Sequence, residues 1–177
     1  LAHSWHNANG FPKTVKEVFT NSEIEVFKDL RVIVAMPEYK VELPGGNQPS
    51  QNDIFMFARN KDEFFTITIE GKVSEDFGPK ILNWKKNIKS ENSGKPERLE
   101  FIKNKLGLNN KDDINHIRYQ LMHRTVSAIV RAKSVNSGSA MMLVHSFSQD
   151  DEHIEDSEKF VEASGSIWEK YQEWQKE

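Results

Sequence analysis

The 177-residue chain has the length of one ordinary domain, and 37% of its residues, among them 11 Phe and 4 Trp, are hydrophobic, which is enough for one core. The chain has no Cys, which excludes disulfides, thiolate metal sites and a Cys nucleophile, and no apolar run reaches the roughly 20 residues of a membrane helix. The net charge of −3 is unevenly distributed: residues 1–79 carry 8 Lys/Arg and 12 Asp/Glu (−4), residues 80–133 carry 13 and 5 (+8), and residues 134–177 carry 3 and 10 (−7).

In the first half of the chain, the pattern predicts one helix followed by three strands, at residues 12–20, 30–36, 53–59 and 64–73. The helix is indicated by apolar residues at helical spacing behind Pro12. The first strand is a β-branched apolar run, and residues 39–43 either continue it or pair with it across Pro37. The polar turn at 60–63 between the last two strands has the composition of a hairpin connection.

In the second half, the pattern predicts helices at 78–86, 96–106 and 112–133, a strand at 140–147 and a helical segment at 154–175. Gly107 closes the second helix, and Asp112 and Asp113 open the third, which is the longest. The order predicts one mixed α/β domain at 1–150, in which a mixed sheet is flanked by helices. Residues 80–111 would form a basic helical insertion, and residues 151–177 an acidic helical extension.

The predicted hairpin brings three charged residues together at its open end. Folding its strands antiparallel about Lys61 places Asp53 opposite Glu70, and the alternation of side chains along a strand puts Glu70 and Lys72 on one face. Asp53 and Glu70 could hold Mg²⁺, which takes oxygen ligands and keeps several waters. Lys72 beside the ion would orient or help deprotonate an attacking water. The alternative is that these residues are the solvated ends of two strands.

The predicted order is helix, three strands, helix and strand, with Asp at the start of the second strand and Glu-x-Lys near the end of the third. This arrangement resembles the PD-(D/E)xK (restriction endonuclease-like) nuclease superfamily. The resemblance implies an αβββαβ core, a Mg²⁺ (or Mn²⁺) cofactor on Asp53 and Glu70, and a catalytic role for Lys72. The acidic residue of the family's first helix corresponds to Glu17, the only acid in that predicted helix. The Pro that often precedes the family's Asp is absent, since Asn52 stands there.

Two groups of residues are candidates for binding a substrate phosphate. Gln120 and Arg124 lie on a polar stripe of the long helix, which packs beside the site in the superfamily, and Arg offers paired donors that match phosphate oxygens. Lys80 and Lys85 belong to the basic insertion, which would contact a phosphate backbone without reading sequence. The insertion contains Lys80, Lys85, Lys86, Lys89, Lys95, Arg98, Lys103 and Lys105. For both groups, the alternative is a solvated surface with ordinary salt bridges.

Two functions remain open from the sequence. The first is a metal-dependent phosphodiesterase that hydrolyses DNA or RNA, and the second is a non-catalytic domain of the same fold that binds nucleic acid or a protein through its basic segment. A third hypothesis, an enzyme of different chemistry, would use His123 or His145, although a hydrogen-bonded core histidine is the more ordinary role for each. The runs 70–73, 118–124 and 144–148 also resemble an uncharacterised bacterial family, which implies no activity. We expect no membrane partner and, by default, a cytoplasmic location.

Overall fold

The computed structural model describes residues 2–22, 24–86, 93–109, 112–148 and 152–164. Its centre is a four-stranded sheet in the order β1-β2-β3-β4, formed by β1 (Arg31–Val41), β2 (Ser50–Arg59), β3 (Phe64–Lys72) and β4 (Ser139–Ser146). The first three strands are a meander of antiparallel pairs, whereas β4 is parallel to β3. A parallel neighbour requires a long crossover, which here contains the helices between β3 and β4. The predicted mixed sheet flanked by helices is confirmed.

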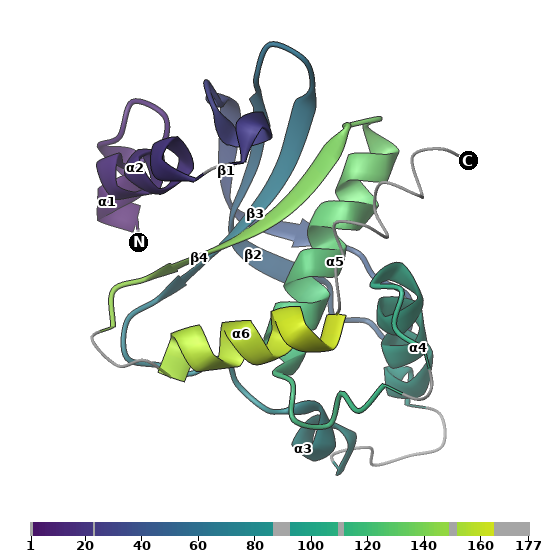
Figure 1. Cartoon of the computed structure of the whole chain (residues 1–177). Coiled ribbons are helices and arrows are strands. Elements are labelled where there is room, and N and C mark those ends of the chain that lie inside the picture. Colours follow the sequence, from purple (N-terminus) through teal and green to yellow (C-terminus); the bar gives the residue numbers. More distant parts are fainter. Residues whose placement is uncertain (1, 23, 87–92, 110–111, 149–151, 165–177) are drawn as a thin grey trace.

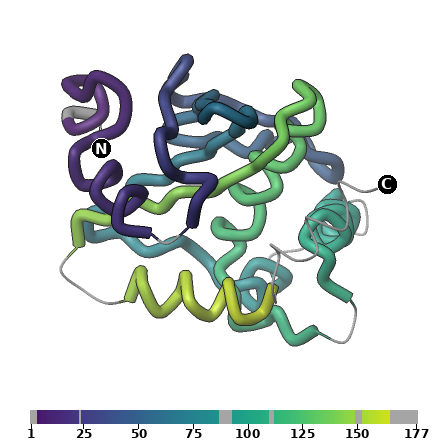
Figure 2. Tube along the Cα trace, turned by 45° about the horizontal axis from the view of Figure 1, so that its top comes forward, coloured from purple at the N-terminus to yellow at the C-terminus, as the bar shows by residue number. Residues whose placement is uncertain are grey.

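Helices lie on both faces of the sheet (Figure 1). The helices are α1 (Ala2–His6), α2 (Lys13–Asn21), α3 (Ile81–Lys86), α4 (Lys95–Lys105), α5 (Tyr119–Ser134) and α6 (Glu152–Ser164), with a 3₁₀ turn, η1 (Glu25–Phe27), before β1. The α1–α2 pair covers one face and α5 covers the other, and α6 lies across the ends of β3 and β4 (Figures 1 and 2). None of the helices in the described ranges is both long and apolar enough to cross a membrane.

The alternation of side chains along β3 separates two cores. Phe65, Ile67 and Ile69 pack with α1 and α2 in one buried cluster. The opposite face of β3 carries Thr66, Thr68, Glu70 and Lys72, and all four are also buried. These polar residues lie under α5, whose apolar residues pack into a second cluster with residues from α3, α4 and α6. Burial of polar groups is costly unless they are hydrogen-bonded. Thr68 Oγ1 donates to the Arg124 carbonyl of α5 at 3.1 Å, whereas Thr66 Oγ1 has no partner within the described residues.

The predicted hairpin is confirmed, and its turn has a specific cause. The Asn60 side chain accepts hydrogen bonds from the backbone N–H groups of Asp62 (2.9 Å) and Glu63 (2.8 Å). An Asn side chain that bonds to its own following backbone favours a turn over a continued strand. Residues 31–41 form one strand through Pro37, so the second predicted segment continues the first rather than pairing with it.

The predicted start of the long helix at Asp112 is wrong, because α5 begins at Tyr119. The two Asp side chains bond locally instead: Asp112 accepts from the N–H of Asn109 at 2.7 Å, and Asp113 from that of Asn115 at 3.0 Å. Such bonds stabilise turns in competition with a helix. The predicted helical segment at 154–175 is present as α6 up to Ser164, and the remainder lies outside the described residues.

Candidate functional site

The candidate site lies where β2 and β3 separate. Their antiparallel ladder runs from Arg59↔Phe64 to Ile54↔Ile69 and stops one pair before Asp53 and Glu70. Beyond this point a side-chain hydrogen bond links the two strands instead: Asp53 Oδ2 accepts from the N–H of Gly71 at 2.8 Å. The Asp53 carboxylate is therefore held against the segment that carries Glu70 and Lys72, as the hairpin prediction requires.

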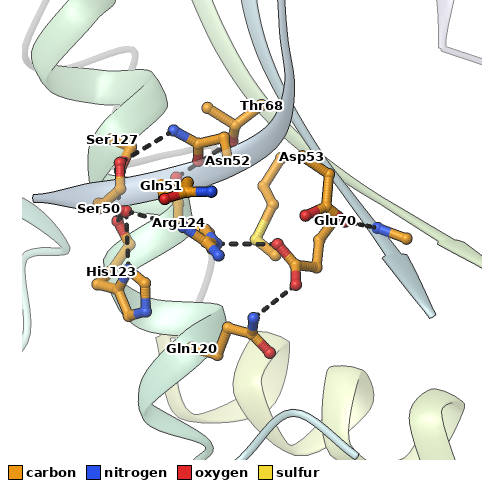
Figure 3. Close-up of polar contacts among 12 residues, drawn as sticks. Ser50, Gln51, Asn52, Asp53, Thr68, Glu70, Gln120, His123, Arg124 and Ser127 are labelled. Carbon is orange, nitrogen blue, oxygen red and sulfur yellow. Dashed lines mark hydrogen bonds and ion pairs between the residues drawn. The ribbon is translucent and has the colours of Figure 1, made fainter. Parts of the chain in front are cut away.

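Glu70 is contacted by Lys72 of its own strand and by two residues of α5, Gln120 and Arg124, which Figure 3 shows. Lys72 Nζ lies 3.1 Å from Oε1, and Gln120 Nε2 donates to the same oxygen at 2.5 Å. Arg124 Nε donates to Oε2 at 2.8 Å. Glu70 and Lys72 are each 4% exposed, so these contacts are shielded from solvent. Gln120 and Arg124 are four residues apart on α5 and therefore project from the same side of the helix.

The charges in this network balance. Asp53 and Glu70 contribute two negative charges, and Lys72 and Arg124 contribute two positive ones. Burial raises the pKa of the Glu70 carboxyl; Arg124 and Lys72 act in the opposite direction, while the nearby charge of Asp53 adds to the increase. A low-dielectric environment disfavours an isolated carboxylate, and the two cations offset part of that cost for Glu70.

A cavity of about 620 Å³ opens beside the network. Its lining includes Asp53, Gly71 and Lys72 together with Glu38 and Glu75, and the apolar part comes from Trp5, Ala35, Pro37, Ile54 and Val73, with His6 at one side. Asp53 is only half-buried and faces this space. Glu70 is not among the lining residues, but it contacts Lys72, which is.

The donor set suits a hard divalent cation. Carboxylate oxygens are the ligands of Mg²⁺, which is held by one or two protein carboxylates, with water and substrate phosphate completing its shell. Within the described residues, no group of three or more His, Asp or Glu is placed to hold a metal. Asp53 and Glu70 would therefore be the only protein ligands described. Since both Glu70 oxygens already accept donors, a cation would have to displace Gln120 or Arg124 from Glu70.

The sequence pattern of one protein family matches residues 1–176. The chain belongs to the DUF6946 family. The description of this family is a domain of unknown function, so membership assigns no chemistry to the site. Comparison with curated proteins and with solved structures found no match in either set.

The predicted role of Glu17 is wrong in this DUF6946 domain. Its helix, α2, buries Val15 and Phe19 against the sheet face opposite α5. Glu17 points outward, with its side chain 56% exposed and 3.7 Å from Lys13. Glu70 and Lys72 face α5, so the sheet separates them from Glu17. A helix of nine residues buries only one side, and the spacing of Val15 and Phe19 already placed Glu17 on the other.

The basic insertion contributes less than predicted. Arg98 is buried and donates to the carbonyl oxygens of Leu43 (2.8 Å), Pro44 (3.0 Å), Gly46 (3.1 Å) and Gln48 (2.5 Å), so the expectation that it contacts a phosphate backbone is wrong. These four hydrogen bonds hold the loop between β1 and β2, and thereby the approach to Asp53.

Lys80 and Lys85 are not brought to the cavity. Lys80 forms an isolated bridge with Arg118, and Lys85 Nζ donates to the Asn115 side chain at 3.1 Å. Both residues lie on or next to α3, and neither belongs to the cavity lining. A role in contacting a longer nucleic acid beyond the cavity stays a prediction, and Lys89 of the same insertion lies outside the described residues.

Sequence reasoning missed a third carboxylate at the site. The β1–β2 register, Pro37↔Ile54 and Tyr39↔Asn52, places Glu38 opposite Asp53, so Glu38, Asp53 and Glu70 occupy one row across three strands. Glu38 has a positive φ of 53°, and its carboxylate accepts a hydrogen bond from Gln51. A bulky residue in this conformation is strained unless its surroundings hold it. The sequence signal for this irregularity is Pro37 directly before Glu38, because Pro within a strand indicates an edge strand or a bulge.

His123 and His145 are hydrogen-bonded side chains with identifiable partners. His123 Nδ1 lies 2.8 Å from Ser50 Oγ, and His145 Nδ1 accepts from Trp5 Nε1 at 3.0 Å. Burial, with smaller contributions from Arg124 and Arg98, lowers the pKa of His123 to about 3. His123 is therefore neutral at pH 7 and acts as a structural contact between α5 and β2.

The depressed pKa of His123 predicts a pH-dependent loss of stability. In the unfolded chain His123 takes up a proton near pH 6.5, whereas in the folded chain it does so near pH 3, so acidification favours unfolding between these values. Its stabilising contribution is complete above pH 6.5 and should fall by about 1.4 kcal/mol for each pH unit below that. Urea unfolding of wild type and His123→Gln between pH 7 and 5 measures this. The exposed His116→Gln serves as the control and should retain the wild-type slope; an identical slope in His123→Gln would contradict the assignment.

Proposed function

We propose that this domain is a divalent-cation-dependent phosphodiesterase that hydrolyses DNA or RNA. The observation that carries the proposal is the convergence of Asp53, Glu70 and Lys72 where β2 and β3 separate, beside a cavity and under Gln120 and Arg124 of α5. The resemblance of this motif to the PD-(D/E)xK superfamily supports it, as does the αβββαβ order of the elements.

In the proposed reaction each residue has a distinct task. Asp53 and Glu70 would hold Mg²⁺ or Mn²⁺, which when bound supplies positive charge to the phosphate and acidifies a water. Lys72 is one of the cavity-lining residues, and its ammonium group contacts Glu70, so beside a cation on Glu70 it would orient the attacking water and stabilise the charge that develops on the phosphate. Gln120 and Arg124, once released from Glu70, would donate to the phosphate oxygens, for which the guanidinium is well matched.

A second candidate, a non-catalytic binding domain, is favoured by one observation. Glu70 is fully satisfied without a cation, because Lys72, Gln120 and Arg124 together occupy both of its oxygens. In such a domain the network would serve only to fix α5 on β3. Removal of Lys72 or Arg124 would then leave the buried Glu70 carboxylate without a compensating charge, and it would not tighten the binding of a divalent cation.

Cation binding separates the two candidates. If Asp53 and Glu70 hold the ion, Arg124→Gln should tighten Mn²⁺ binding by about tenfold, because it removes a positive charge worth about 1–4 kcal/mol at this range and frees Oε2 of Glu70. Glu70→Gln should abolish binding. Isothermal titration with Mn²⁺ measures both constants, and Arg59→Gln, at an exposed position on β2, is the control. Weaker binding in Arg124→Gln than in wild type, or binding unaffected by Glu70→Gln, would refute the site.

A further inference from the structure

The two edges of the sheet are built differently. The outer strand β1 carries an irregularity between Val32 and Val34, followed by Pro37 and by Glu38 with its positive φ. Irregularities and Pro on an edge strand hinder the addition of another strand. The opposite edge, β4, has none of these features: its sequence SAMMLVHS contains no Pro, Gly, Lys, Arg, Asp or Glu. Its register with β3 is continuous from Phe65↔Ser139 to Lys72↔Ser146.

The outer backbone of β4 is nearly unpartnered. Within the described residues, the one hydrogen bond to its main chain from outside the sheet is donated by Ser137 Oγ to the Ser139 carbonyl, at 3.1 Å. Residues 140–146 are all half-buried, so the strand is not covered over by the rest of the domain. Unpaired N–H and C=O groups in a row are a template for another strand.

A cavity of about 1030 Å³ runs beside the C-terminal half of β4, next to α2. Residues 143–147 all line it, although successive side chains of a strand point to opposite faces. The cavity therefore follows the edge of the strand and does not lie over one face alone. Figure 2 shows the α1–α2 pair beside this end of β4. The Trp5–His145 hydrogen bond ties α1 to the same part of the strand.

The cavity lining has a definite chemical character. Its charged side chains are Lys13 and Lys16, and no Asp or Glu lines it. Lys13 lies 3.7 Å from Glu17, whereas Lys16 has no carboxylate partner within the described residues. Apolar surface is available on Val18, which is 63% exposed, and Phe147, which is 41% exposed. The complementary ligand is extended, carries apolar side chains, and bears at least one carboxylate.

We propose that the β4 edge docks an extended acidic segment of a partner protein, which adds to the sheet as a fifth strand and places a carboxylate at Lys16. Main-chain hydrogen bonds give such strand addition its affinity, and flanking side chains give it specificity. A second copy of β4 is a poorer occupant, because β4 contains no acidic residue to meet Lys13 and Lys16. This interface is independent of the proposed phosphodiesterase activity.

The probe is a random library of eight-residue peptides displayed on phage and selected on the full chain. We expect the selected peptides to be acidic and rich in β-branched residues, and to slow amide hydrogen exchange in β4. Synthesised copies should bind at least about tenfold more weakly to Lys16→Glu, as judged by fluorescence polarisation. Lys61→Glu, in the exposed turn between β2 and β3, is the matched control and should bind as wild type does.

Four results would overturn the interface. These are selection of no peptide, protection of amides elsewhere than in β4, equal affinity for Lys16→Glu and wild type, and a concentration-dependent dimer of the chain alone that protects β4. None of them involves a divalent cation, so failure here is distinct from failure of the proposed activity.

Discussion

Replacement of Lys72 by Met should lower the rate of Mn²⁺-dependent nucleic acid cleavage by about 10²–10⁴-fold, the range that positioned proton-transfer groups contribute. The variant removes the ammonium group that contacts Glu70, but it keeps an unbranched side chain of similar length. Glu70 retains Arg124 and Gln120 as partners, so the domain should stay folded.

The rate is measured with a uniformly labelled DNA at saturating Mn²⁺. Lys159→Met is the control, since Lys159 lies on α6, pairs with Glu155 and does not line the cavity, and it should cleave at the wild-type rate. Isothermal titration of Lys72→Met should show Mn²⁺ bound at least as tightly as by wild type, because a cation has been removed from beside the ligands. Undiminished cleavage in Lys72→Met would remove Lys72 from the mechanism.

Arg118→Leu should destabilise the domain by about 3–5 kcal/mol, the cost of removing one partner from a buried ion pair. Arg118 Nε donates to Asp156 at 2.6 Å, and Asp156 is 3% exposed. The same guanidinium contacts Asp76 at 3.1 Å and Glu152 at 2.8 Å, and donates to the Gly78 carbonyl. Without Arg118, Asp156 is left as an unpaired buried carboxylate.

This loss should be concentrated at α6, which Arg118 joins to the segment after β3. Urea unfolding gives the total change, and hydrogen exchange should show α6 opening before the sheet. Arg59→Leu, an exposed arginine over the Phe64 ring, should change the stability by less than about 0.5 kcal/mol. A similarly small change in Arg118→Leu, with α6 still protected, would show that the ion pairs contribute nothing net.

The part of the site that could be predicted from sequence is the part that strand geometry decides. Alternation along β3 put Glu70 and Lys72 on one face, and the hairpin put Asp53 opposite Glu70, without any knowledge of packing. Gln120 and Arg124 followed from helical spacing, because four residues return a side chain to the same side of α5. Such local periodicities hold regardless of what surrounds them.

The errors arise where a long-range partner decides the outcome. Arg98 looked like a surface cation in a lysine-rich segment, but four carbonyls of a loop some fifty residues earlier in the chain bury it. Asp112 and Asp113 suit a helix start, yet each caps a local turn. That donors occupy both Glu70 oxygens could not be predicted either, because it depends on the side of β3 on which α5 packs.

The most direct test of the central claim is cleavage by Asp53→Asn. Asn is the same shape as Asp and can keep the hydrogen bond from Gly71, so it removes charge from the proposed metal site while preserving the strand contact. The full chain is incubated with single- and double-stranded DNA and with RNA in Mg²⁺ or Mn²⁺. The proposal predicts that wild type cleaves at least one of these substrates and that Asp53→Asn is slower by at least about a hundredfold. Equal cleavage by the two proteins, or no cleavage by wild type under any of these conditions, would contradict it.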